Sequence, residues 1–132
     1  MYKVNGKEYH CSVSIVQDIF NDKWKLGVIW HLMDGEKRYK ELHEEMCDIT
    51  QKTLTVKLRE LEEYGILTRE VFPEVPPKVI YSLTPIGKKL RPLLKEMFDW
   101  GIDYVQERGE FTEGVVCDSR VAQMKSECVL EQ

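Results

Sequence analysis

Apolar residues recur at helical spacing along most of the chain, and this pattern predicts most of its elements. The stretch 12–34 predicts two short helices, the first with Val13 and Phe20 on one face. The second, "KWKLGVIWHLM", is apolar on nearly every side, which predicts that it lies deep in the core. Asn21 or Asp22 is the expected N-cap of this second helix.

Two further amphipathic segments follow, with a tight turn between them. In "YKELHEEM" the residues Tyr39, Leu42 and Met46 fall on one helical face. Thr50 is the expected N-cap of the next helix, whose leucines recur every three or four positions until Gly65 ends it. A helix, a short turn and a second helix form a helix-turn-helix unit.

The interval between the helix-turn-helix unit and the last predicted helix has the composition of β-strands. "ILTREVF" and "KVIYSL" are rich in β-branched and aromatic residues, and "PEVPP" separates them, so they predict a hairpin. Thr84 and Pro85 then begin a long helix that keeps its period from Ile86 to about Arg108, with a bend expected at Pro92. The fold class predicted is mainly α with a small β-hairpin (α+β). The domain would span 1–108, followed by a tail, 109–132, with a weak helical pattern.

The charge is unevenly distributed. The net charge of −4 argues against a protein that coats nucleic acid without selectivity. However, residues 50–59 contain three bases and no acid, and residues 75–95 contain five bases and no acid. Three glutamates follow the first group within the same helix, although a helix dipole favours acids at the start and bases at the end. A localised anionic partner accounts for this order better than local helix stability does.

The order of elements predicts a winged helix-turn-helix with added N- and C-terminal helices, and such a module inserts its second helix into the major groove of DNA. The candidate base and phosphate contacts are the polar residues of the first half of that helix, Thr50, Gln51, Lys52, Thr53, Thr55, Lys57 and Arg59. Two lysines, Lys78 of the hairpin and Lys88, are the candidate contacts to backbone phosphates. The expected partner is double-stranded DNA with an inverted-repeat operator, because two copies read successive turns.

The same residues also allow other classes of function. An exposed basic face is often only solvated, and a winged helix that binds another protein is the main alternative. A thiol enzyme needs a base beside its cysteine, and only His10 and Cys11 are neighbours, so no enzyme is expected. The cysteines and histidines lack zinc-site spacing, so no metal or cofactor is expected. Without an apolar stretch of about 18 residues or a signal peptide, the protein is expected to be cytoplasmic.

Two long segments, "DKWKLGVIWHLMDGEKRYKEL" and "ITQKTLTVKLRELEEYGILTREVFPEVPPKVIYSLTPIGKKLRPLL", together with Trp100, resemble the HxlR-type bacterial transcriptional regulators. The resemblance covers about residues 11–105 and is carried by many positions in order, including the proline-rich wing. It implies a homodimeric winged-helix DNA-binding protein without catalytic activity. The dimer would be formed by residues 12–20 and 86–108, and the tail lies outside the resemblance.

The resemblance also draws attention to Cys11. Members of the family often have a cysteine near the N-terminus followed by Pro-Val, and Cys11-Ser12-Val13 matches except at Ser12. In some members that thiol senses oxidants or electrophiles, so Cys11 is the candidate redox sensor, with an oxidant or small molecule as effector. The start of a helix favours thiolate, and the alternative is a thiol that only packs against the dimer partner.

Overall fold

The computed structural model describes residues 1–46, 48–110 and 112. Two predictions therefore concern residues outside the described part of the chain. They are the weak helical pattern expected in the tail and any part that Cys47, Cys117 or Cys128 plays beside Cys11.

The chain begins with a small hairpin that the apolar pattern did not predict. Strands β1 (Tyr2–Val4) and β2 (Lys7–Tyr9) pair antiparallel. Asn5 and Gly6 join them with positive φ angles of 51° and 78°, as a two-residue turn between twisted strands requires. The hairpin packs against helix α1 (Ser12–Ile19), where the Lys7 ammonium lies 2.6 Å from an Asp18 carboxylate oxygen.

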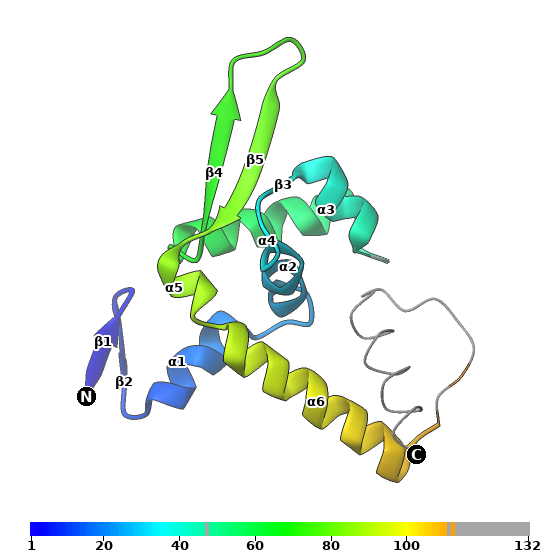
Figure 1. Cartoon of the computed structure of the whole chain (residues 1–132). Coiled ribbons are helices and arrows are strands. Elements are labelled where there is room, and N and C mark those ends of the chain that lie inside the picture. Colours follow the sequence, from blue (N-terminus) through cyan, green and yellow to red (C-terminus); the bar gives the residue numbers. More distant parts are fainter. Residues whose placement is uncertain (47, 111, 113–132) are drawn as a thin grey trace.

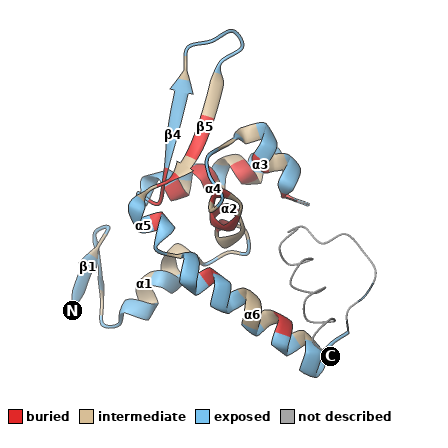
Figure 2. Ribbon diagram, in the orientation of Figure 1, coloured by how far each residue is buried: buried red, intermediate tan, exposed pale blue. Residues whose placement is uncertain are grey.

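Three helices form the centre of the molecule. They are α2 (Lys25–Leu32), α3 (Tyr39–Glu45) and α4 (Gln51–Glu63). The apolar helix α2 lies in the middle of the fold, as predicted, and its buried residues pack with Leu42 of α3 and with the leucines of α4 (Figures 1 and 2). The N-cap position of α2 is Trp24, not Asn21 or Asp22 as predicted, but Asp22 Oδ1 accepts hydrogen bonds from the backbone N–H groups of Trp24 and Lys25 just before and at the helix start.

A three-stranded antiparallel sheet lies beside α4. Its order is β3 (Lys37–Arg38), β5 (Lys78–Leu83), β4 (Leu67–Phe72). The two long strands and the loop 73–77 form the predicted hairpin, called the wing below. It projects beyond the helices (Figure 1). Strand β3 was not predicted, because a strand of two residues has no periodicity to detect.

The long helix predicted over 86–108 is two helices, so that prediction was wrong. Helix α5 (Pro85–Lys88) ends, and α6 (Arg91–Arg108) begins with Pro92 in its first turn. A proline has no N–H to donate and its ring obstructs the carbonyl four residues earlier, so it interrupts a continuous helix. In the first turn of a new helix no such donor is needed. As a result, α6 runs along the lower edge of the molecule beneath α2 (Figure 1).

Candidate nucleic-acid interface

The start of α4 is held in place by side-chain hydroxyl groups. Thr50 Oγ1 accepts the Thr53 N–H at 3.1 Å, which confirms the predicted N-cap. The Tyr39 hydroxyl, from α3, and the Thr55 hydroxyl both donate to the carbonyl of Gln51, at 2.9 and 2.8 Å. The predicted contact residues Thr50, Thr53 and Thr55 therefore also fix the helix end, with their hydroxyl groups hydrogen-bonded to it.

Beyond these hydroxyls, α4 presents an exposed side formed by Gln51, Lys52, Val56 and Arg59. No hydrogen bond or ion pair joins the side chains of Gln51, Lys52 or Arg59 to any described residue. Val56 is 40% exposed between the two cations, although an apolar side chain there gains nothing from water. Sequence reasoning missed Val56, and its spacing from Lys52 and Arg59 (i+4 and i−3) is the signal that identifies it. Apolar contact with a thymine methyl is a common use of such a position.

Lys57 is placed differently from the other predicted contacts. Its side chain is only 18% exposed, and its ammonium lies 3.3 Å from Asp22 Oδ2 and 3.7 Å from Glu60 Oε2. These acids belong to the α1–α2 loop and to the second half of α4. The structure therefore brings Lys57 into an internal ion cluster rather than onto the side that carries Lys52 and Arg59.

The centre of that cluster is Lys25, which has only 3% of its side chain exposed. Its ammonium lies 2.8 Å from Glu60 Oε2 and 3.3 Å from Asp22 Oδ2, and it donates to the carbonyl of Ile19 at 3.0 Å. Burial opposes the charge of Lys25, but its carboxylate partners outweigh burial and raise its pKa. Burial also opposes the charge of Asp22, whose hydrogen bonds from Lys25 and Trp24 nevertheless lower its pKa. The cluster thus joins the end of α1 to α4.

The two lysines proposed for phosphate contacts lie in different regions. Lys78, at the start of β5, is half-buried and its ammonium lies 5.4 Å from the centroid of the Phe72 ring, its partner across the wing. Lys88 is exposed on α5, at the base of the wing beside α6 (Figure 1). The structure does not bring Lys88 close to the wing tip, where Val75 is fully exposed.

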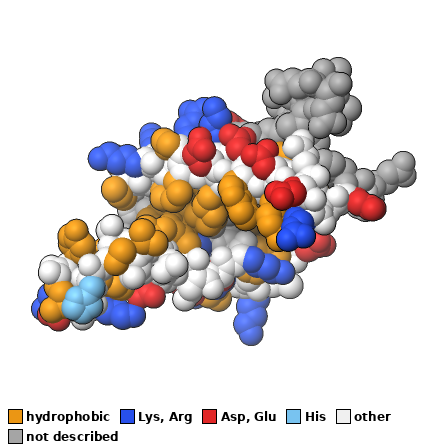
Figure 3. Space-filling view, turned by 90° about the horizontal axis from the view of Figure 1, so that it is seen from below, with side chains coloured by type: hydrophobic (Ala, Val, Ile, Leu, Met, Phe, Trp, Pro, Cys, Tyr) orange, Lys and Arg blue, Asp and Glu red, His pale blue; other side chains and the backbone are white. Residues whose placement is uncertain are grey.

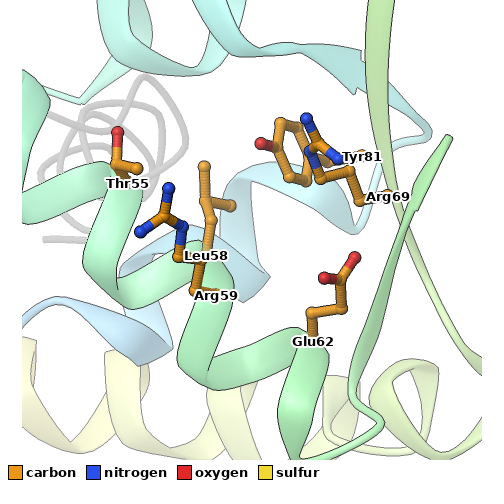
Figure 4. A pocket seen from close by; sticks show the side chains of 6 residues that line it. All are labelled: Thr55, Leu58, Arg59, Glu62, Arg69 and Tyr81. Atoms are coloured by element: carbon orange, nitrogen blue, oxygen red, sulfur yellow. The ribbon is translucent and has the colours of Figure 1, made fainter. Parts of the chain in front are cut away.

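A hollow of about 220 Å³ lies between α4 and the wing. Thr55, Leu58, Arg59 and Glu62 line it from α4, and Arg69 and Tyr81 line it from the wing (Figure 4). Arg69 was missed because "ILTREVF" was interpreted only as a strand. The alternation of side chains along β4 identifies Arg69. Leu67 is buried, so Arg69, two positions later, lies on the same face of β4.

Cys11 occupies the N-cap position of α1, as predicted, and is exposed. Among the described residues no group of three or more histidine, cysteine, aspartate or glutamate side chains is arranged to hold a metal ion. Within the same part of the chain, no helix is long and apolar enough to cross a membrane.

Comparison with known proteins agrees with this architecture. Residues 19–109 match the family described as HxlR-like helix-turn-helix. The HTH-type transcriptional regulator YdeP of Bacillus subtilis is 48% identical over 94 residues, which cover 71% of this chain and 73% of YdeP. The redox regulator HypR in its oxidised form superposes with a TM-score of 0.66 at 41% identity, over 80% of this chain and all of HypR. The reduced transcriptional regulator YodB of B. subtilis gives a TM-score of 0.65 at 39% identity, over 77% of this chain and all of YodB.

The matched residues contain the helix-turn-helix unit, the wing and α6, so the winged-helix fold predicted from the sequence is confirmed. The chain therefore belongs to the HxlR-like helix-turn-helix family of DNA-binding transcriptional regulators.

Proposed function

We propose that the protein acts as a homodimer that binds an inverted-repeat operator in double-stranded DNA. The observation that carries this proposal is the exposed side of α4, where Gln51, Lys52 and Arg59 have no polar partner among the described residues. The helix start beneath them is fixed by Tyr39 and Thr50. Long polar side chains on a rigid helix start are the arrangement by which a helix-turn-helix protein contacts base edges.

Substitution of Gln51 or Lys52 with alanine is expected to relax sequence preference, because glutamine pairs with adenine and lysine with guanine. Each lost base contact would reduce discrimination by about 1–3 kcal/mol. The measurement uses a duplex that the parent protein selects from a random library. Affinity for this duplex and for single-base variants of it measures the effect. Lys3→Ala, an exposed cation on β1, is the matched control and should behave like the parent. Unchanged discrimination in both α4 variants would refute the assignment of α4 as the reading helix.

The dimer proposal rests on an apolar stripe that the described residues leave uncovered. Leu93, Met97, Trp100 and Tyr104 recur along α6 and are 40–66% exposed, while Leu94 and Ile102 on another side of this helix are buried. Hydrophobic side chains gather in a band across the lower face of the molecule (Figure 3). A continuous exposed apolar band marks an interaction site. An inverted repeat needs two reading helices about 34–36 Å apart, and therefore a second copy of the chain. We propose that this copy is seated on the apolar band.

Trp100→Glu is expected to shift the protein from dimer to monomer, because it places a charge where an exposed aromatic side chain would be buried. Sedimentation at micromolar concentration measures this shift. Gln106→Glu adds the same charge to another side of α6 and serves as the control. A parent protein that sediments as a monomer contradicts the dimer, and so does a Trp100→Glu variant that remains dimeric.

The main alternative is a winged helix whose basic surface binds another protein. The salt dependence of affinity separates the two functions. Contacts to DNA phosphates release counterions, so the logarithm of the binding constant falls steeply and linearly with the logarithm of salt concentration. Weak binding to DNA, without sequence preference and without a steep fall as salt concentration rises, would favour the alternative.

We also propose Cys11 as the thiol through which an oxidant acts on DNA binding. It is exposed at the start of α1, where Val13 and Val16 are also exposed. The structural relative HypR is described as a redox regulator, which supports the same use here. A change at this position would alter the surface that α1 contributes to the dimer.

Diamide converts two thiols to a disulfide and takes up their two hydrogens, so it is expected to change operator binding by the parent and not by Cys11→Ser. The untreated variant should bind like the untreated parent, which controls for the substitution itself. Operator affinity before and after treatment is the measurement. A Cys11→Ser variant that responds like the parent removes Cys11 as the sensor and leaves the DNA-binding proposal intact.

A further inference from the structure

We infer that the hollow between α4 and the wing holds a single phosphate group of the DNA backbone, bound jointly by Arg59 and Arg69. The inference rests on the proposed DNA-binding function and adds a contact residue, Arg69, that was not among the predicted contacts. The two arginines line the hollow from two different elements, α4 and β4 (Figure 4).

The two guanidinium groups reach the hollow from opposite walls. Arg59 extends from the middle of α4, whereas Arg69 extends from β4, where its direct partner across the wing is Tyr81. Tyr81 is 8% exposed, so the surface on which Arg69 lies is part of the packed sheet. On the other side of Tyr81, Lys37 of β3 is already bound to Glu45, with its ammonium 3.0 Å from Oε1. Of the two cations that flank Tyr81 in the sheet, Arg69 is therefore the one without an acidic partner among the described residues.

The charges of the lining favour an anion. Neither Arg59 nor Arg69 lies within ion-pair distance of an acid among the described residues, although Glu62 also lines the hollow. Two cations and one acid leave the lining with a net charge of +1. Guanidinium groups bind phosphate through paired hydrogen bonds, and such charge-assisted bonds are about twice as strong as neutral ones. The volume of about 220 Å³ suits a phosphate group and is smaller than most sites for drug-sized molecules.

The position of the hollow identifies the source of that phosphate. If α4 enters the major groove, a hairpin beside it lies over the neighbouring groove, and one DNA strand runs between them. The hollow is lined from both of these elements, so it lies where that strand would pass (Figure 4). An exposed pair of arginines binds free phosphate weakly, because water competes at an open site. A phosphate of a duplex already bound through α4 is held beside the arginines, so its effective concentration there is high.

Single methylphosphonate substitutions test this inference, since each removes one phosphate charge from the duplex that the parent protein selects from a random library. At one phosphate in each half-site, the substitution should weaken binding by the parent roughly ten- to a hundredfold, as expected for lost hydrogen bonds to a charged group. The same substitution should have little effect on Arg69→Gln and on Arg59→Gln. The two variants should lose sensitivity at the same phosphate, and the double variant should bind only slightly more weakly than either single one.

The control is Lys3→Gln, which should keep the parent's sensitivity at every phosphate. Sensitivity lost at different phosphates in the two arginine variants overturns the shared site, and so does parent-like binding by Arg69→Gln. Inorganic phosphate at matched ionic strength should not compete. Competition that Arg69→Gln abolishes would instead assign the hollow to a free anion. If the parent selects no duplex at all, the DNA-binding proposal itself has failed, which is a distinct result.

Discussion

Lys25→Met is expected to lower the free energy of unfolding by about 3 kcal/mol, at the lower end of the range for opening a buried ion pair. The substitution leaves Glu60 and Asp22 facing an apolar side chain, and it removes the donor to the Ile19 carbonyl. The lower end applies because Glu60 is 36% exposed and Lys57 remains beside both acids. Denaturant unfolding at one fixed protein concentration measures the loss, because association shifts apparent stability.

Lys23→Met provides the matched control. Lys23 is exposed and its ammonium lies 4.5 Å from the centroid of the Trp24 ring, a contact worth about 0.5–1 kcal/mol at the surface. A loss at Lys25 no larger than the loss at Lys23 would show that the cluster does not stabilise the fold.

The stability difference between the parent and Lys25→Met should depend on pH only at its extremes. Asp22 has a pKa below its ordinary value of 3.8, so the stability it contributes is present above that value and is lost as pH falls through its folded pKa. Lys25 has a pKa above its ordinary value of 10.5, so its contribution is present below that value and is lost as pH rises through its folded pKa. The difference should therefore be constant near neutral pH and shrink in strong acid and strong base.

Gly87→Ala is expected to destabilise the fold by about 3 kcal/mol, the upper part of the range for overpacking. A Cβ at Gly87 would lie 2.3 Å from the carbonyl oxygen of Ile66. That oxygen cannot move away without cost, because the backbone N–H and the hydroxyl of Thr84 both donate to it, at 3.0 and 2.9 Å. The same contact attaches α5 to the base of the wing, so the loss should appear in thermal and denaturant unfolding alike.

Gly101→Ala is the control for this substitution. Gly101 lies inside α6, and a Cβ there would meet no atom within 4 Å. Alanine is a better helix former than glycine by about 1 kcal/mol, so this variant should be as stable as the parent or more stable. Equal effects at Gly87 and Gly101 would contradict the close approach of α5 to Ile66.

The elements with strong periodicity were predictable from the sequence. The apolar α2, the leucine-bearing α4 and the wing were placed correctly, because each has a core face that its residue spacing reveals. The N-terminal hairpin was missed although Asn5-Gly6 is a good turn signal, because its strands of three residues are too short to alternate clearly. At Pro92 the helical period continued across a break, so the period alone could not distinguish one bent helix from two.

The candidate interface was predictable at the level of the element rather than the side chain. Composition identified α4 as basic at its start, but Lys57 belongs to an internal cluster that depends on Asp22, 35 positions earlier. Strand β4 is buried at its first residue and exposed at the next four, and its side chains keep alternating between the two faces. Arg69 therefore lies on the same face as the first residue but outside the core, where it lines the hollow. Contacts between distant segments decide which cations remain available, and spacing along the chain does not reveal them.

Selection from a random duplex library tests the central claim most directly, with the parent and Lys52→Ala selected in parallel under the same salt conditions. We expect the parent to enrich an inverted repeat whose half-sites are centred about 34–36 Å apart, or a multiple of that distance. Lys52→Ala should enrich the same repeat with preference lost at one position in each half-site. A parent that enriches no sequence, or one whose selected sequence is unchanged by Lys52→Ala, would contradict the assignment of α4 as the helix that reads DNA.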